Sequence, residues 1–372
     1  MLPRTVLFIF GTRPEAIKLS PLVLYLKRFP ELYRVKVCVT AQHREMLDQV
    51  LGVFHVTPDF DLDVMRPGQS LYQSTASIIA GLDRVFADVK PDLAVVQGDT
   101  TTTFCGALAA FYGRVPVAHV EAGLRTWDLQ QPFPEELNRV LTARITALHF
   151  AATQGAADNL AREGISSNVW VTGNTGIDAV LYVRDGLERG EFASETREFQ
   201  SRVILVTAHR RESFGEGFDR ICDAILQLAV RRDVHVVYPV HPNPNVRTAV
   251  NARLSGHPNI TLLEPMDYVP FVDLMRRAYI ILTDSGGIQE EGPSLGKPVL
   301  VLREKTERPE AVTAGTVKLV GTDVSRIVGE TTTLLDQPAE YRRMSHIHNP
   351  YGDGHACARI EAACRTFLLG QS

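Results

Sequence analysis

The chain has 372 residues, of which 45% are hydrophobic and 22% are charged, and its formal net charge is −4. This length is too great for one compact core and indicates two domains. The mild acidity argues against nucleic acid or an anionic membrane as the main partner.

The five cysteines are scattered and show no C-x-x-C spacing, which is typical of small buried side chains in a reducing compartment. No segment reaches 18 uninterrupted apolar residues, and the first apolar run, residues 6–10, is too short for a signal peptide. We therefore expect a cytoplasmic protein.

Short apolar segments recur along the chain with helical stretches between them. In the first half they are residues 6–10, 35–40, 93–97, 115–120, 148–153 and 169–172. In the second half they are residues 203–207, 234–240, 260–264, 279–283, 298–302 and 317–320. Strands that alternate with helices form parallel sheets, so we predict an α/β protein with two such domains. The polar stretch 173–201 has the weakest strand pattern, and we place the interdomain connection at its start, near residues 173–176.

Unusual residues follow these strands, at the sheet edge where α/β proteins bind ligands. After the first strand, Arg13 and Lys18 flank a helix start with Pro14 as its first residue. Two cations beside a glycine turn favour an anionic ligand over a merely solvated helix end.

Three acidic positions suggest proton transfer. Asp99 follows the third strand, Glu121 ends the fourth, and Glu135 stands at a loop–helix junction. Asp99 alone is also compatible with a helix cap. Crowded or buried carboxylates have separated pKa values, which suits paired acid and base roles.

In the second half, a glycine turn follows the strand at 279–283. Ser285, Gly286 and Gly287 precede a helix predicted from Ile288 to about residue 296. Backbone N–H groups at a helix start suit a phosphate, and Glu291 is placed to accept hydrogen bonds from ribose hydroxyls. The alternative is a tight turn that needs glycine for its backbone angles.

Further cations and histidines follow other strands of this half. They are His209 with Arg210 and Arg211, His241, and Arg308. We interpret His209 and the two arginines as partners of phosphate charge; the alternative for them is a surface ion-pair cluster. Arg308 provides another cation near the glycine turn. The group His346, His348 and His355 has no spacing typical of a metal site.

No G-x-x-x-x-G-K-[ST] is present, and no G-x-G-x-x-G follows any predicted strand. The chain is therefore neither a P-loop nucleotidase nor a protein that holds a nicotinamide dinucleotide tightly, and we expect no cofactor and no metal.

Several segments match one family. They are G-T-R-P-E-A-I-K at 11–18, Q-H-R-E-M-L-D-Q-V-L at 42–51, Q-G-D-T at 97–100, H-V-E-A-G-L-R-T at 119–126, H-R-R-E-S-F-G at 209–215, T-D-S-G-G-I-Q-E-E at 283–291 and T-E-R-P-E at 306–310. The chain resembles the bacterial non-hydrolysing UDP-N-acetylglucosamine 2-epimerases from about residue 6 to its last helix.

This resemblance implies a glycosyltransferase-B-type fold, with two Rossmann-like parallel-sheet domains facing across a cleft. Residues 1–172 would form the first domain, joined by the C-terminal helix at about 355–372, and residues 173–354 the UDP-binding domain. The family interconverts UDP-N-acetylglucosamine and UDP-N-acetylmannosamine, supplies surface polysaccharide synthesis and is usually homodimeric.

The resemblance also implies roles for individual residues. Those grouped around the sugar and diphosphate are Arg13, Lys18, Asp99, Glu121, Glu135 and His209. Those that bind UDP are Met266 at the uracil, Phe271, Ser285, Gly286, Gly287, Glu291 and Arg308.

Some members of the family bind a second, activating UDP-N-acetylglucosamine. Gln42, His43 and His241 match positions of that site. Glu45 and Gly68 stand where the regulated members tend to have Gln and Arg, and these departures argue against activation here.

The C2–H bond of this sugar has no neighbouring carbonyl, so epimerisation needs transient oxidation at C3 or elimination of UDP. The missing dinucleotide fingerprint favours elimination. Three rivals remain: a glycosyltransferase of the same fold, a hydrolysing 2-epimerase that releases N-acetylmannosamine and UDP, and a non-catalytic sugar-nucleotide sensor. The three carboxylates count against the sensor.

Overall fold

A computed structural model describes residues 2–40, 44–64, 66, 68–194, 199–210 and 213–370, with the backbone alone at 44 and 45. The chain divides into two compact units. Unit 1 comprises Met1–Ala179 and Gly352–Ser372, and unit 2 comprises Val180–Tyr351. The division falls inside helix α7 (Thr175–Glu188), so a helix occupies much of the polar stretch that followed the last predicted strand of the first half.

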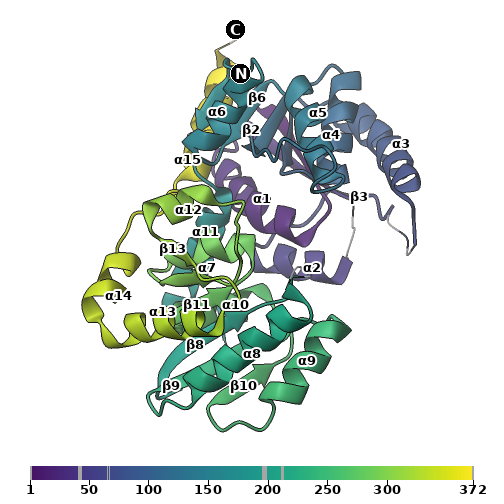
Figure 1. The fold of residues 1–372 in the computed structure, drawn as a ribbon. Coiled ribbons are helices and arrows are strands. Elements are labelled where there is room, and N and C mark those ends of the chain that lie inside the picture. The colour runs from purple at the N-terminus through teal and green to yellow at the C-terminus, as the bar shows by residue number, and fades with distance from the viewer. Residues whose placement is uncertain are drawn as a thin grey trace. The chain divides into compact units, whose positions relative to one another are not determined.

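Unit 1 contains a seven-stranded parallel sheet in the order β3-β2-β1-β4-β5-β6-β7 (Figure 1). Its strands are β1 (Arg4–Phe10), β2 (Tyr33–Val39), β3 (Phe60–Asp61), β4 (Leu93–Gln97), β5 (Val117–Ala122), β6 (Leu148–Ala151) and β7 (Val169–Val171). The six predicted strands are all present. The two-residue β3 is additional, because so short a strand carries no readable pattern.

Helices cover both faces of this sheet. They are α1 (Arg13–Leu26), α2 (Arg44–Val53), α3 (Leu71–Val89), α4 (Thr101–Tyr112), α5 (Glu135–Ile145), α6 (Gln154–Arg162), α7 and α15 (Ala356–Leu369). Leu7 and Ile9 pack into the core that α3 and α4 complete, while the alternating Phe8 and Phe10 are equally buried on the other face.

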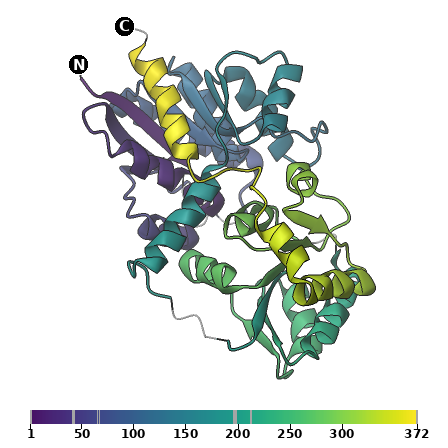
Figure 2. The same ribbon diagram turned by 90° about the vertical axis from the view of Figure 1, so that its left-hand side faces the viewer.

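Helix α15 joins the chain's C-terminal residues to unit 1. It packs against α1, and the hydroxyl of Tyr33 donates a hydrogen bond to Glu361 Oε1 at 2.9 Å. Figure 2 shows α15, in yellow, lying along the N-terminal elements. The family resemblance described above implies that the last helix packs against the first domain in this way.

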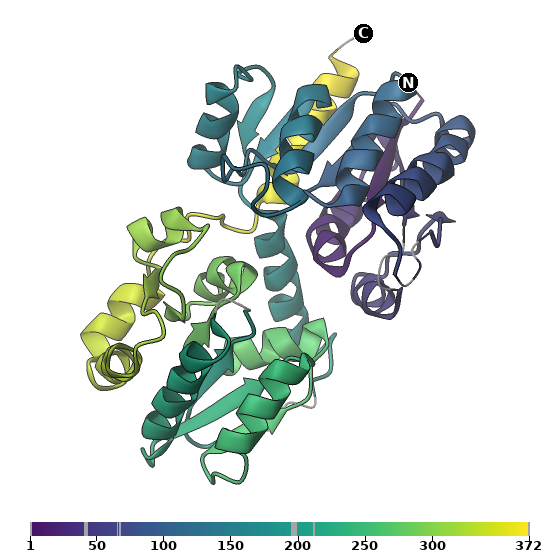
Figure 3. The same ribbon diagram turned by 45° about the vertical axis from the view of Figure 1, so that its right-hand side comes forward.

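Unit 2 contains a six-stranded parallel sheet in the order β10-β9-β8-β11-β12-β13. Its strands are β8 (Arg202–Thr207), β9 (Val234–Pro239), β10 (Ile260–Leu263), β11 (Ile280–Thr283), β12 (Val299–Val301) and β13 (Val317–Leu319), all as predicted within two residues. Its helices are α8 (Glu216–Ala229), α9 (Pro244–Leu254), α10 (Tyr268–Arg277), α11 (Gly286–Ser294), α12 (Pro309–Ala314), α13 (Val324–Asp336) and α14 (Pro338–Ser345). Figure 3 shows α8 and α9 side by side over the sheet.

Within the described ranges, no helix combines the length and apolarity that a membrane crossing requires. No three His, Cys, Asp or Glu side chains of these residues gather as metal ligands would, and His346, His348 and His355 form no such group. The five cysteines are buried thiols.

Candidate active site

The turn after β1 is organised by Glu15, a carboxylate that is 1% exposed. Its Oε2 accepts hydrogen bonds from the backbone N–H groups of Gly11 at 3.0 Å and Thr12 at 2.7 Å. Its Oε1 accepts from the hydroxyls of Thr100 at 2.7 Å and Thr103 at 3.1 Å. Glu15 therefore ties the end of β1 to the start of α4. The T-x-x-E capping box was the sequence signal for this role, which the sequence analysis did not assign.

Arg13 and Lys18 both lie on α1. The helix begins at Arg13, so Pro14 is its second residue and not, as predicted, its first. Arg13 is partly exposed and has no ion-pair partner among the described residues. Lys18 Nζ lies 2.7 Å and 2.6 Å from the two carboxylate oxygens of Glu121.

Glu121 stands in an irregular part of strand β5. The register with β6 shifts between Val120 and Ala122, and Glu121 itself has a φ of 65°, in the left-handed region. Besides Lys18, its carboxylate accepts hydrogen bonds from the side-chain amides of Asn174, at 3.3 Å, and Gln97. A non-glycine residue in this conformation costs roughly 1–3 kcal/mol, and such strain clusters at functional sites.

His119 supports the neighbouring turn. Its Nε2 lies 2.7 Å from the carbonyl oxygen of Gly98, and because a carbonyl only accepts, Nε2 carries the proton. Burial lowers the pKa of His119 to about 4, so the ring is neutral at pH 7. The contact holds Gly98 at a φ of 74° and thereby positions the next residue, Asp99.

Asp99 binds a buried guanidinium instead of capping a helix. Its Oδ2 accepts from Arg139 Nε at 2.9 Å and Nη2 at 2.7 Å, while Thr100 caps α4. Arg139 Nη1 also donates to Glu136 Oε2 at 2.7 Å. These bonds bring the first turn of α5, which starts at the partly exposed Glu135, to the end of β4. Glu135 has no side-chain hydrogen bond to any other described residue.

In unit 2, the predicted glycine turn is the first turn of α11. The helix begins at Gly286, two residues before the predicted start, with Ser285 as its N-cap. Neither Gly286 nor Gly287 has a positive φ, and an added Cβ would come no closer than 3.8 Å to Arg308 Nη2 or 3.7 Å to Glu291 Oε1. The alternative that the fold needs glycine here for its backbone angles is therefore wrong. A Cβ at either position would make only ordinary van der Waals contacts.

Arg308 lies over this turn and is fixed by neighbours. Its Nε donates to the buried carboxylate of Glu290. Thr306 hydroxyl donates to Gln289 Oε1 at 2.6 Å, and Gln289 Nε2 donates to Ser285 O at 3.2 Å. Glu290 and Gln289 thus hold the turn and the Arg308 loop together.

His209 stands beside the same turn, because Asp284 joins the two. The fully buried Asp284 accepts backbone hydrogen bonds through Oδ2 from His209 at 2.6 Å and Arg210 at 2.7 Å. Asp284 Oδ1 lies 3.4 Å from His209 Nδ1. The His209 ring stacks on His241, with centroids 4.9 Å apart. Burial lowers the pKa of His209, and Asp284 opposes that effect.

The remaining candidate residues make fewer contacts with the glycine turn. Phe271 lies in α10 and Met266 in the turn before it, after the end of β10; both are partly buried. Within the described residues, no hydrogen bond or ring contact joins either one to the glycine turn. Gln42 and His43 lie outside the described residues, as does Arg211, and the side chain of Glu45 is not described.

Comparison with known proteins identifies the family. The profile of the UDP-N-acetylglucosamine 2-epimerase family matches residues 27–365. The UDP-N-acetylglucosamine 2-epimerase of Salmonella typhimurium is 56% identical, over 98% of this chain and 99% of that protein. The crystal structure of UDP-GlcNAc 2-epimerase from Neisseria meningitidis, bound to UDP-GlcNAc, is 51% identical with a TM-score of 0.87, covering 97% of this chain and 99% of that one.

A more distant solved structure has the same fold. The Methanocaldococcus jannaschii UDP-GlcNAc 2-epimerase, in complex with UDP-GlcNAc and UDP, is 32% identical with a TM-score of 0.78 and covers 99% of this chain and all of that one. These neighbours and the two parallel sheets confirm the predicted glycosyltransferase-B-type fold class. The chain belongs to the UDP-N-acetylglucosamine 2-epimerase family.

Proposed function

We propose that this protein reversibly epimerises C2 of UDP-N-acetylglucosamine to give UDP-N-acetylmannosamine, by elimination and re-addition of UDP. It would supply surface polysaccharide synthesis, and the cysteine pattern supports a cytoplasmic location. The observation that carries the proposal is Glu121, a strained carboxylate at a strand end that Lys18, Asn174 and Gln97 hold in place. Folding alone gives no reason for an acidic residue in that conformation.

UDP binds, in this proposal, to unit 2. The diphosphate lies on the N–H groups of Gly286 and Gly287 and beside Arg308, and the ribose on Glu291. The Ser285 N–H, which the sequence also predicts to bind phosphate, instead donates to Thr283 Oγ1 at 3.0 Å. The proximity of Arg308 to Gly286 and of Glu291 to Gly287 supports this assignment. Met266 contacts the uracil, and Phe271 is a further UDP-binding residue. The complexes of the Neisseria and Methanocaldococcus enzymes with UDP-GlcNAc are consistent with such a ligand.

The chemistry starts with loss of UDP. As the C1–O bond breaks, its electron pair stays on the UDP oxygen, where Arg13, Lys18 and Arg308 stabilise the negative charge together with the amides of α11. A carboxylate removes the C2 proton, and a C1=C2 double bond forms. His209, held by Asp284, donates a hydrogen bond to the departing diphosphate.

Re-addition completes the reaction. An acid returns a proton to the opposite face of C2, and the UDP oxygen attacks C1. We assign the two proton transfers to the set Asp99, Glu121 and Glu135. The substrate undergoes no net oxidation or reduction, so these steps need no oxidant.

Product analysis tests this function. Wild-type protein should convert UDP-N-acetylglucosamine to an equilibrium mixture that keeps the UDP–sugar bond. General acid–base groups contribute about 10²–10⁴-fold, so Glu121→Gln should lower kcat by that amount while the UDP Kd stays near the wild-type value. Stoichiometric release of UDP would identify a hydrolase or transferase instead, and wild-type-like turnover in Glu121→Gln would remove the assigned role.

We also propose a homodimer formed through the helical layer of unit 1. Helix α4 packs between α3 and α5, and it exposes Phe111 (57%) and Tyr112 (68%) near its end. Leu137 and Leu141 on α5 are also exposed, and apolar surface of this kind marks an interface. Sedimentation should show a dimer that Phe111→Glu converts to a monomer; a wild-type monomer would contradict it.

A further inference from the structure

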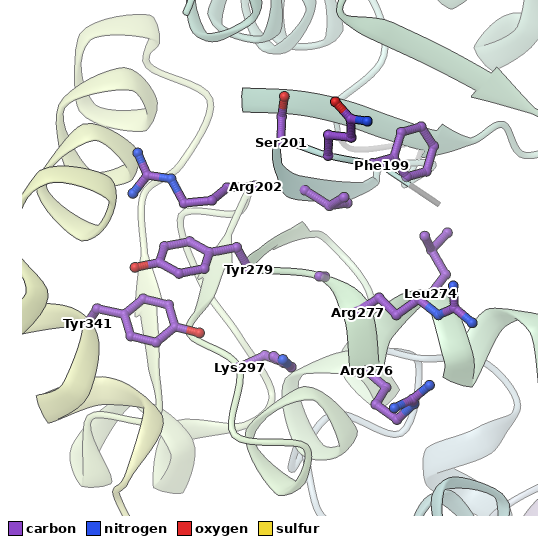
Figure 4. Close-up of a pocket in the computed structure, with 12 residues that line it drawn as sticks. Phe199, Ser201, Arg202, Leu274, Arg276, Arg277, Tyr279, Lys297 and Tyr341 are labelled. Atoms are coloured by element: carbon purple, nitrogen blue, oxygen red, sulfur yellow. The ribbon is translucent and has the colours of Figure 1, made fainter. Parts of the chain in front are cut away.

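A pocket lies in unit 2, and none of the candidate UDP residues lines it. Its volume is about 570 Å³, which is within the usual range for small-molecule sites. Among the residues that the structure describes, its lining side chains include no carboxylate and four cations: Arg202, Arg276, Arg277 and Lys297 (Figure 4).

Among the described residues, two carboxylates, Asp273 and Asp233, form ion pairs with these four cations. Arg276 and Arg277 share one fully buried acid, Asp273, at 2.8 Å and 2.9 Å. Arg202 pairs with Asp233. Lys297 has no ion-pair partner within the part of the chain that the structure describes. The described part of the lining therefore has more cations than carboxylates that pair with them.

Lys297 is the side chain least explained by the fold. Burial lowers its pKa, and the nearby positive charge of Arg276 lowers it further. Arg276 and Arg277 lie in the last turn of α10, where cations stabilise a helix end. That role accounts for these two residues but not for a half-buried lysine facing them. An anion between Lys297 and Arg276 would turn their repulsion into attraction.

One wall of the pocket is aromatic. The rings of Tyr279 and Tyr341 stack with centroids 4.1 Å apart, and the Arg202 guanidinium lies 5.2 Å from the Tyr279 ring centroid. Figure 4 shows this tyrosine pair on one side, Arg276 and Arg277 on the other, and Lys297 toward the bottom of the view. Such a wall suits the carbon skeleton or ring of a ligand whose charged group faces the cations.

We propose that this pocket binds a small phosphate-bearing metabolite. Its phosphate contacts Lys297, Arg276 and Arg277, and its remaining atoms lie against Tyr279 and Tyr341. Charge-assisted hydrogen bonds from guanidinium and ammonium groups favour a dianionic phosphate over a neutral sugar.

The pocket and the candidate UDP site lie at opposite edges of the sheet. Arg202 begins β8, and Tyr279 and Lys297 stand just before β11 and β12, whereas His209 and the glycine turn follow the ends of these strands. Strands of this length separate the two edges by about 13–20 Å. The ligand would therefore occupy its pocket together with UDP and not compete with it.

Calorimetry with glucose 6-phosphate tests the proposal, with UDP at saturation and glucose as the neutral control. Wild-type protein should bind glucose 6-phosphate saturably and more tightly than inorganic phosphate, with no heat from glucose. Lys297→Met and Arg276→Gln should each weaken binding at least about ten-fold. Lys318→Met, which removes an exposed cation from β13, should leave it unchanged, and Lys297→Arg should retain it.

Two results would overturn the proposal. One is the absence of saturable binding to the wild type; the other is an unchanged Kd in both Lys297→Met and Arg276→Gln. A cooperative thermal transition confirms that each variant is folded. The variants change residues that line this pocket, so a loss of glucose 6-phosphate binding in them assigns the ligand to the pocket wherever UDP binds.

Discussion

The φ of 65° at Glu121 shows that this single residue is held in a strained conformation by its surroundings. A residue with a side chain tolerates this conformation only where its surroundings fix it, and Lys18, Gln97 and Asn174 do so through the carboxylate. The position of Glu121 at a strand end was predictable, because an apolar run followed by a glycine turn is typical of the end of a buried strand. The left-handed backbone and the three partners depend on tertiary contacts and were not predictable.

His119 and its strand neighbour His149 make stability depend on pH. Burial lowers the pKa of each ring from 6.5 to about 4. Between these values the unfolded chain binds protons that the folded chain does not, so stability falls as the pH drops from 7 to 5. Each histidine should account for roughly 1–2 kcal/mol of that loss.

Urea unfolding at pH 7 and pH 5 measures this effect. His119→Gln, whose amide can still donate to Gly98, should reduce the pH dependence by one histidine's share. His346→Gln, at an exposed position, serves as the control and should leave it unaltered. An identical pH dependence in wild type and His119→Gln would show that His119 is not the group that titrates.

At the scale of elements, a substitution in the first turn of α11 should raise stability while it weakens UDP binding. Gly287 is exposed, lacks a positive φ and has room for a Cβ, so Gly287→Ala should raise stability by about 0.4–1 kcal/mol. The same methyl group stands where the diphosphate is proposed to lie, so the UDP Kd should rise at least about ten-fold. Calorimetry and urea unfolding give the two quantities on one sample.

A matched control is available in α13. An added Cβ at the exposed Gly329 meets nothing within 4 Å, so Gly329→Ala should stabilise the protein similarly without changing UDP affinity. Unchanged UDP binding in Gly287→Ala would remove the diphosphate from this turn. A large loss of stability would show instead that the fold needs the glycine.

Helices and strands were more predictable from the sequence than the side-chain hydrogen bonds that join them. Buried parallel strands such as β8 and β11 appear in the sequence as uninterrupted apolar runs, whereas β3 has only two residues. The start of α11 was placed two residues late, because glycine is a poor helix former and hides the first turn. The networks around Glu15 and Arg139 join segments far apart in the sequence, and only the fold brings their partners together.

At the scale of the whole molecule, the proposal divides the chemistry between the two units. In the proposed mechanism, proton transfer is assigned to Asp99, Glu121 and Glu135, which lie in unit 1, and UDP binding to the turn at Ser285 and to Arg308, which lie in unit 2. Substitutions in the first set should therefore act on kcat, and those in the second on UDP affinity.

The central claim is that the C2 proton is removed and replaced during elimination and re-addition of UDP. NMR of UDP-N-acetylglucosamine incubated with the protein in deuterated buffer, without added NAD, tests it most directly. We predict that deuterium enters C2 as the N-acetylmannosamine epimer appears, with the UDP–sugar bond present in both species at equilibrium. Epimerisation without deuterium uptake at C2 would contradict the account.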